Sequence, residues 1–221
     1  MTVRAAGAYT WRTEKRAKYE EIETVTGEKM FSSDIERILV NEIEIDGIVR
    51  RVAADIDRDY DEGGRFYDET HETKLLLLCI LKGSVVFMGE LMKRISLPVE
   101  IDFIKVASYG ANTQSSGSVN IILDLHRNDI ADLDILIIED IIDSGRTLSY
   151  LVEYLKLKGA YSVRTCTLLD KPSRRELNYQ PDYVGRIIPD EFVVGYGLDY
   201  AERYRALPYV GVLKPEIYTK K

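Results

Sequence analysis

The feature that most constrains the fold is a set of apolar runs of strand length that alternate with helical patterns. Residues 75–81 form an uninterrupted apolar run, which is typical of a strand covered on both faces of a sheet. Residues 135–138 and 163–168 are predicted strands too, and a helix is predicted at residues 147–157 between them. This alternation predicts an α/β domain with a mainly parallel, doubly wound sheet flanked by helices.

Smaller elements complete the predicted domain. Further strands are expected at residues 35–40, 99–106 and 119–123, and further helices at residues 41–60 and 86–92. Asn41 precedes the first of these helices and Glu44 follows three residues later, which is the spacing of a capping box. Apolar residues recur at three- and four-residue steps from Ile45 to Tyr60, so we expect one face of this helix to be buried.

Two polar segments stand apart from this pattern. Residues 1–33 are charged and show too little apolar periodicity to form a hydrophobic core. We therefore expect a loosely ordered extension before a domain at 34–221. Residues 57–73 are polar and contain two adjacent glycines, which predicts a surface loop. His71 and His126 lie in polar surroundings without a second plausible ligand nearby, so they are predicted to be solvated rather than metal-bound.

Composition narrows the classes of protein and of partner. The 221 residues are 45% hydrophobic and carry a net charge of −7 without a long Lys or Arg block, which disfavours nucleic acid as a partner. Cys79 and Cys166 both lie in apolar runs, so reduced thiols are expected rather than a disulfide. No apolar run approaches the roughly 18 residues of a membrane span, and no signal-peptide pattern begins the chain. We therefore expect a soluble cytoplasmic protein without a membrane partner.

Residues 135–147 are the most informative stretch, because a buried strand ends there at the start of a helix. In a doubly wound sheet, ligands bind beyond the carboxyl ends of the strands. At this point residues 143–147, hereafter the phosphate loop, read Asp-Ser-Gly-Arg-Thr. Gly145 permits an unusual backbone angle, successive N–H groups can face one anion, and the Ser144 and Thr147 hydroxyls add donors. The loop matches neither the triphosphate P-loop nor the dinucleotide pattern, and a phosphate group is its expected ligand.

Two adjacent carboxylates, Glu139 and Asp140, precede this loop and form what we call the acidic pair. One interpretation is an acidic turn that caps the following helix, but Asp143 alone would satisfy it. The pair would then remain unexplained. Two carboxylates about one phosphate length from the phosphate loop can accept hydrogen bonds from ribose hydroxyls and can bind a Mg²⁺ ion.

An acidic pair after an apolar strand, followed by Asp-Ser-Gly-Arg-Thr, resembles the phosphoribosyl pyrophosphate motif of type I phosphoribosyltransferases. Other segments resemble hypoxanthine phosphoribosyltransferases of the short bacterial type, and the likeness covers about residues 35–218. These segments are residues 81–84, 108–110, 169–172, 192–200 with Arg205, and 207–218. The resemblance implies the type I fold with a small hood subdomain. It also implies a Mg²⁺-dependent enzyme of purine salvage that joins phosphoribosyl pyrophosphate to N9 of hypoxanthine or guanine.

The resemblance also implies roles on the sugar-phosphate side of the site. The acidic pair should contact the ribose hydroxyls and Mg²⁺, and Asp199 should contact a second Mg²⁺. Lys82, with Gly83 beside it, and Arg205 should hold pyrophosphate. The 5′-phosphate should be bound by Ser144, Gly145, Arg146 and Thr147.

On the purine side, the resemblance implies that Asp143 acts as general base or acid near N7. Lys171 should donate to the 6-oxo group, Phe192 should stack on the ring, and the Val193 backbone should face the exocyclic edge. A mobile loop should close over the site, and it should contain Ser108 and Tyr109.

The residues themselves support these roles to different degrees. A buried ammonium is costly, so Lys171 at the end of a strand requires an acceptor, although it could instead pair with Asp170 in solvent. Phe192 alone is uninformative, because an aromatic residue entering a strand usually belongs to the core. Tyr109 lies in a long Gly/Ser/Asn-rich stretch that suits either a lid or a solvated linker. Ser144 stands where many relatives carry Thr, and either hydroxyl can bind phosphate.

Two other functions stay open at this point. A xanthine-preferring enzyme would differ at the purine 2-position, near Val193. Adenine is disfavoured because it has no 6-oxo group for Lys171. A regulator that senses phosphoribosyl pyrophosphate while binding nucleic acid is disfavoured by the net charge of −7. A homo-oligomer, dimer or tetramer, is implied by the family alone.

Overall fold

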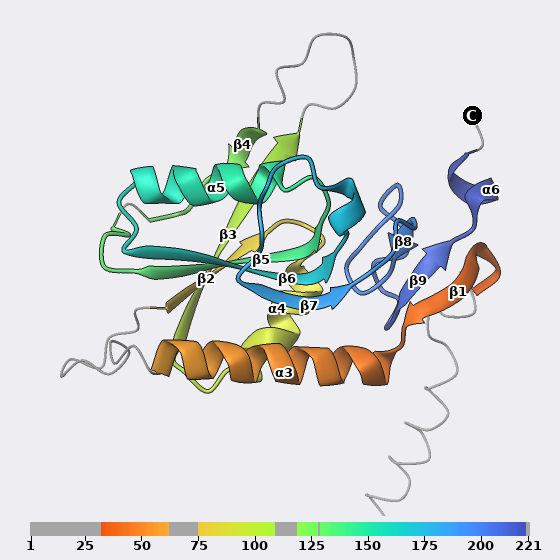
Figure 1. The fold of residues 1–221 in the computed structure, drawn as a ribbon, viewed down its shortest axis with the longest axis horizontal. Coiled ribbons are helices and arrows are strands. Elements are labelled where there is room, and N and C mark those ends of the chain that lie inside the picture. The colour runs from red at the N-terminus through yellow and green to blue at the C-terminus, as the bar shows by residue number, and fades with distance from the viewer. Residues whose placement is uncertain (1–31, 62–74, 109–118, 128, 220–221) are drawn as a thin grey trace, which may run out of the picture.

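A six-stranded sheet forms the centre of the molecule (Figure 1). The computed structural model describes residues 32–61, 75–108, 119–127 and 129–219. The strand order is β4-β3-β2-β5-β6-β7, and all neighbours are parallel except β4, which pairs antiparallel with β3. The strands are β2 (Leu75–Ile80), β3 (Val99–Ser108), β4 (Val119–Leu123), β5 (Asp134–Ile142), β6 (Ser162–Asp170) and β7 (Tyr183–Ile187).

Helices cover both faces of this sheet, as the continuous apolar runs predict. Helix α5 (Arg146–Leu157) lies on one face, and α3 (Glu42–Asp61) and α4 (Val85–Met92) lie on the other (Figure 1). Every residue of β2 is buried, because its side chains alternate between the two apolar clusters formed with these helices. The predicted mainly parallel, doubly wound architecture is confirmed.

A second, smaller sheet lies at the end of the molecule and corresponds to the predicted hood. It consists of β1 (Ile35–Val40), β9 (Val210–Leu213) and β8 (Val193–Val194), paired antiparallel in that order. It has an apolar cluster of its own, separate from the two that cover the central sheet. Short helices η1 (Ser32–Asp34), η2 (Pro172–Arg174) and α6 (Pro215–Tyr218) complete the described elements. The hood thus joins segments from the two ends of the chain.

The capping box at α3 is confirmed: the Asn41 and Glu44 amides each donate to the other residue's side chain at 2.9 Å. The predicted start of a loop at residue 57 is wrong, because α3 continues to Asp61. Arg58 contributes to that difference, since it pairs with Asp55 at the i,i+3 spacing that supports a helix. The remainder of that predicted loop, residues 62–73, and residues 1–31 of the predicted extension lie outside the described residues.

The two cysteines are free and buried, as expected. His126 is exposed, and His71 belongs to a part of the chain that is not described. Within the described ranges, no helix has the length and apolarity needed to cross a membrane.

Candidate functional site

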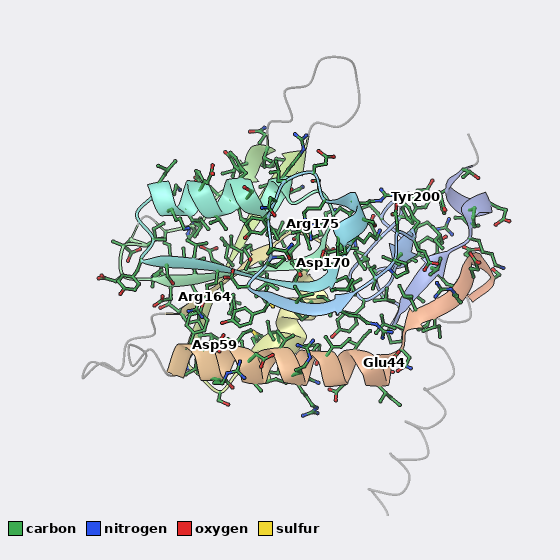
Figure 2. The ribbon with its side chains drawn as sticks, in the orientation of Figure 1. Glu44, Asp59, Arg164, Asp170, Arg175 and Tyr200 are labelled. Atoms are coloured by element: carbon green, nitrogen blue, oxygen red, sulfur yellow. The ribbon has the colours of Figure 1, made fainter. Side chains whose placement is uncertain are left out.

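Most predicted site residues lie at the carboxyl ends of β2, β5 and β6, at the start of β8, or in the hood turn that follows β8, and Ser108 ends β3. Parallel strands end at the same edge, so the topology brings these segments together. Figure 2 shows Asp170 and Arg175 at this edge, with Tyr200 on the neighbouring hood. The site therefore lies between the central sheet and the hood.

The phosphate loop surrounds a cavity of about 130 Å³ at the N-terminus of α5. Gly145 has a φ of 82°, a left-handed conformation that favours glycine, and the Ser144 hydroxyl, not the Asp143 carboxylate, accepts a hydrogen bond from the Arg146 amide at 3.3 Å. Asp143 is therefore not a helix cap, and the simple capping-turn interpretation is wrong. The cavity is lined by Glu139, Ile141, Ile142, Asp143, Ser144, Gly145, Thr147 and Leu148. A helix N-terminus favours an anion, so the cavity can accept a phosphate group.

Arg146 points its guanidinium at a neighbouring loop, since its Nε donates to Glu176 at 2.5 Å. The amides of Glu176 and Leu177 in turn donate to the Ser144 carbonyl at 3.1 and 3.2 Å. The segment after η2 thus packs onto the phosphate loop and holds its backbone.

The acidic pair lies within β5, which runs two residues beyond it. Burial, with the Asp140 charge beside it, raises the pKa of Glu139 well above its usual value. Burial also raises the pKa of Asp140 to about 6, although hydrogen bonds from backbone amides and the Arg205 charge oppose that rise. No described lysine or arginine forms an ion pair with either carboxylate.

Gly83 is required beside this pair, because a Cβ on it would lie 1.5 Å from Asp140 Oδ2. The loop after β2 consequently packs directly on the acidic pair. Two partly buried carboxylates without a cation fit a Mg²⁺ ion. Within the described ranges no three metal-ligand side chains converge, so the protein would supply these two carboxylates and the substrate further oxygens.

Lys171 and Asp143 face each other, with Nζ 3.9 Å from Oδ1. Lys171 is 6% exposed, and burial lowers its pKa although the Asp143 charge opposes this. The alternative that Lys171 pairs with Asp170 in solvent is wrong, since the buried Asp170 carboxylate pairs with Arg175. Asp143 Oδ1 is buried without a hydrogen-bond partner among the described residues. The pair can thus accept a ligand that offers both a donor and an acceptor.

Arg175 supports this pair from behind and was not predicted. Its guanidinium donates to the Asp143 carbonyl and to the Asp170 carboxylate, and its side chain is only 11% exposed. It therefore connects the ends of β5 and β6. An arginine in a polar loop is usually solvated, so the sequence carried no signal for this role.

Phe192 is not a core residue, because 38% of it is exposed. Its ring is stacked on Tyr218 with centroids 4.7 Å apart, and Tyr200 approaches edge-on at 5.6 Å. Val193, the next residue, begins β8 and is buried. The two tyrosines hold the Phe192 ring in place, and neither was predicted to belong to the site.

Lys82 and Arg205, hereafter the cation pair, both contact Glu202. Lys82 Nζ lies 2.9 Å from Glu202 Oε1, and Arg205 Nη2 lies 3.3 Å from Oε2. Arg205 also pairs with Asp199 at 2.8 Å, and the second Asp199 oxygen accepts the Glu202 amide at 2.8 Å. Both Asp199 oxygens are thus engaged in the protein, and its contact with a second Mg²⁺ stays a prediction.

The hood turn and the loop after β2 touch closely. Gly197 has a φ of 100°, and a Cβ on it would lie 2.0 Å from the Gly83 carbonyl oxygen. This contact brings the cation pair together across two elements. Of the predicted mobile loop, Ser108 ends β3 and Tyr109 lies beyond the described part of the chain, so that prediction stays untested.

Comparisons with known proteins identify the family of this chain. Residues 39–201 match the model of the phosphoribosyl transferase domain family. A hypoxanthine-guanine phosphoribosyltransferase of Bacillus subtilis is 50% identical over 189 residues, which cover 86% of this chain and 99% of that protein. The bifunctional protein TilS/HprT of Listeria monocytogenes is 46% identical over 209 residues, 95% of this chain. This match spans only 31% of the Listeria protein's length.

Solved structures match as well. A hypoxanthine phosphoribosyltransferase of Staphylococcus aureus superposes with a TM-score of 0.77 at 43% identity, covering 86% of this chain and 98% of that one. One from Trypanosoma cruzi superposes with a TM-score of 0.77 at 38% identity over 84% of this chain. The chain belongs to the phosphoribosyltransferase family and, within it, to the hypoxanthine-guanine phosphoribosyltransferases of the bacterial type.

Proposed function

We propose that this chain transfers the phosphoribosyl group of phosphoribosyl pyrophosphate to N9 of hypoxanthine or guanine, releasing pyrophosphate. The observation that carries this proposal is the buried Lys171 ammonium beside Asp143, at the edge where the phosphate loop and the acidic pair also lie. The name of a relative that is 50% identical supports it. The catalytic unit is residues 34–221, with residues 1–33 as an extension.

The sugar-phosphate end of the substrate occupies the sheet edge. The phosphate-loop amides and the Ser144 and Thr147 hydroxyls bind the 5′-phosphate beside the N-terminus of α5. The acidic pair accepts hydrogen bonds from the ribose hydroxyls. A Mg²⁺ ion bound there would neutralise the charge of pyrophosphate as it leaves. The cation pair binds pyrophosphate at the boundary with the hood.

The purine lies between the hood and the end of β6. Lys171 donates to the 6-oxo group, and Phe192, fixed by Tyr218, stacks on the ring. Asp143 takes the proton that the purine loses as N9 bonds to the sugar carbon and the bond to pyrophosphate breaks. The unpartnered Asp143 Oδ1 suits this task, because it is free to accept a hydrogen bond.

Magnesium-dependent synthesis of nucleotide from hypoxanthine or guanine tests this function. Wild type should be active, Asp143→Asn should lose at least about 100-fold in kcat, and the exposed control Asp129→Asn should match wild type. Turnover with xanthine alone would replace the proposed base, and unchanged activity in Asp143→Asn would remove its proton-transfer role. No turnover with any purine would overturn the enzyme proposal.

Two further expectations accompany this function. We expect a homo-oligomer, dimer or tetramer, which sedimentation of the purified chain would test. We also place the protein in the cytoplasm, because Cys79 and Cys166 are free, buried thiols.

A further inference from the structure

The two members of the cation pair share one carboxylate in this structure, although they come from separate elements. Lys82 follows β2 and Arg205 belongs to the hood turn, and both reach Glu202, at 2.9 and 3.3 Å. A carboxylate carries the same kind of oxygen acceptors as a phosphate group. Glu202 therefore lies where the proposed pyrophosphate oxygens would bind.

A tight turn presents Glu202 to these cations. Tyr200 and Arg203 exchange backbone hydrogen bonds of 3.2 and 3.0 Å, and the Glu202 amide donates to Asp199. Glu202 has a φ of 62°, in the left-handed region that non-glycine residues sparsely populate. The carboxylate is thus held against the cation pair by the backbone.

The side chain of Glu202 contributes little else to the fold. It is 64% exposed, and Lys82 and Arg205 are its polar partners among the described residues. Exposed ion pairs of this kind are weak, so an incoming anion can displace this carboxylate. Because these ion pairs cost little free energy to break, Glu202 and a bound anion can replace each other on the cation pair.

We propose that Glu202 is an internal anion that occupies the cation pair when pyrophosphate is absent and competes with pyrophosphate for it. This inference rests on the proposed function, since it assigns pyrophosphate to Lys82 and Arg205. Glu202 lowers the affinity for the pyrophosphate end of the substrate and speeds release of the product. Without the Glu202 charge, Asp199 would be the remaining salt-bridge partner of the cation pair among the described residues, so pyrophosphate would be held more tightly.

Titration calorimetry with inorganic pyrophosphate and Mg²⁺ tests the competition. Glu202→Gln keeps the shape of the side chain and removes its charge, and the control Glu153→Gln removes a charge from an exposed position on α5. We expect pyrophosphate to bind Glu202→Gln about 3- to 10-fold more tightly, since two exposed ion pairs are lost. Glu153→Gln should bind as wild type does, and thermal melting should confirm that both variants fold.

A second background separates direct competition from a general change in charge. In a Lys82→Gln chain, the gain from Glu202→Gln should fall to less than half, because the shorter of the two contacts is already absent. An undiminished gain there would overturn direct competition. Pyrophosphate binding by wild type with no tightening in Glu202→Gln would overturn this inference alone. If wild type bound neither pyrophosphate nor phosphoribosyl pyrophosphate, the proposed function would fail together with it.

Discussion

The two sides of the candidate site hold their charges in different ways. On the sheet side, Lys171 and Asp170 are buried, and the Arg175 side chain that pairs with Asp170 is only 11% exposed. On the hood side, Lys82 and Glu202 are more than half exposed. The free energy of folding depends strongly on buried charges, and burial also shifts their pKa values. Exposed ion pairs are individually weak, and their partners are easily exchanged. The sheet side is thus suited to hold the reacting groups, and the hood side to bind and release an anion.

Arg175→Ala should have the largest effect on stability. It would leave the Asp170 carboxylate buried and unpaired, which typically costs about 3–5 kcal/mol in free energy of unfolding. The adjacent Arg174 pairs with Asp190 in an exposed position, so Arg174→Ala should cost about 1 kcal/mol or less. Denaturant unfolding of both variants measures the difference. Equal losses in free energy of unfolding would mean that burial does not make the Arg175 ion pair stronger than the exposed Arg174 pair.

Lys171→Met should lower kcat/KM for hypoxanthine by about 100- to 1,000-fold, because a site built around a donor is left without it. Stability should not fall, since burial lowers the pKa of Lys171, which means that burying its charge opposes folding. Steady-state kinetics and thermal melting of the same preparation test both statements. Loss of activity through unfolding would contradict the second.

Asp140→Asn should stabilise the metal-free protein at neutral pH. Its folded pKa of about 6 lies above its unfolded value, so wild type loses stability as pH rises through this window. The variant should therefore gain roughly 1–3 kcal/mol at pH 7.5, and this gain should disappear below about pH 4. Melting in the presence of a chelator at both pH values measures it. A gain that persists at low pH would point to a cause other than ionisation.

Arg37→Ala should have the smallest effect. Arg37 pairs with Glu191 at 2.5 Å, but the arginine side chain is 46% exposed. We expect a loss of about 0.5 kcal/mol or less, which 1 M salt should abolish. Chemical denaturation at low and high salt tests this. A loss as large as that of Arg175→Ala would erase the distinction between exposed and buried pairs.

Sequence periodicity predicted the central sheet better than the hood. The apolar runs at β2 and in the first part of β5 are continuous because both of their faces are covered, and such a pattern is visible in one segment. Strands β8 and β9 are short, and they form a sheet only by pairing with one another and with β1 from the other end of the chain. No local pattern reports that pairing, so only the family resemblance suggested the hood.

The same division applies to the candidate site. The chain itself determined the phosphate loop, the capping box and the acidic pair, because each depends on residue types at short, fixed spacing. Tertiary structure decided which cations face which carboxylates. Arg175 reaches Asp143 across 32 residues, and Lys82 reaches Glu202 across 120. Burial and charge pairing arise only when distant segments are packed together, and they are the quantities that shift a pKa or set the strength of an ion pair.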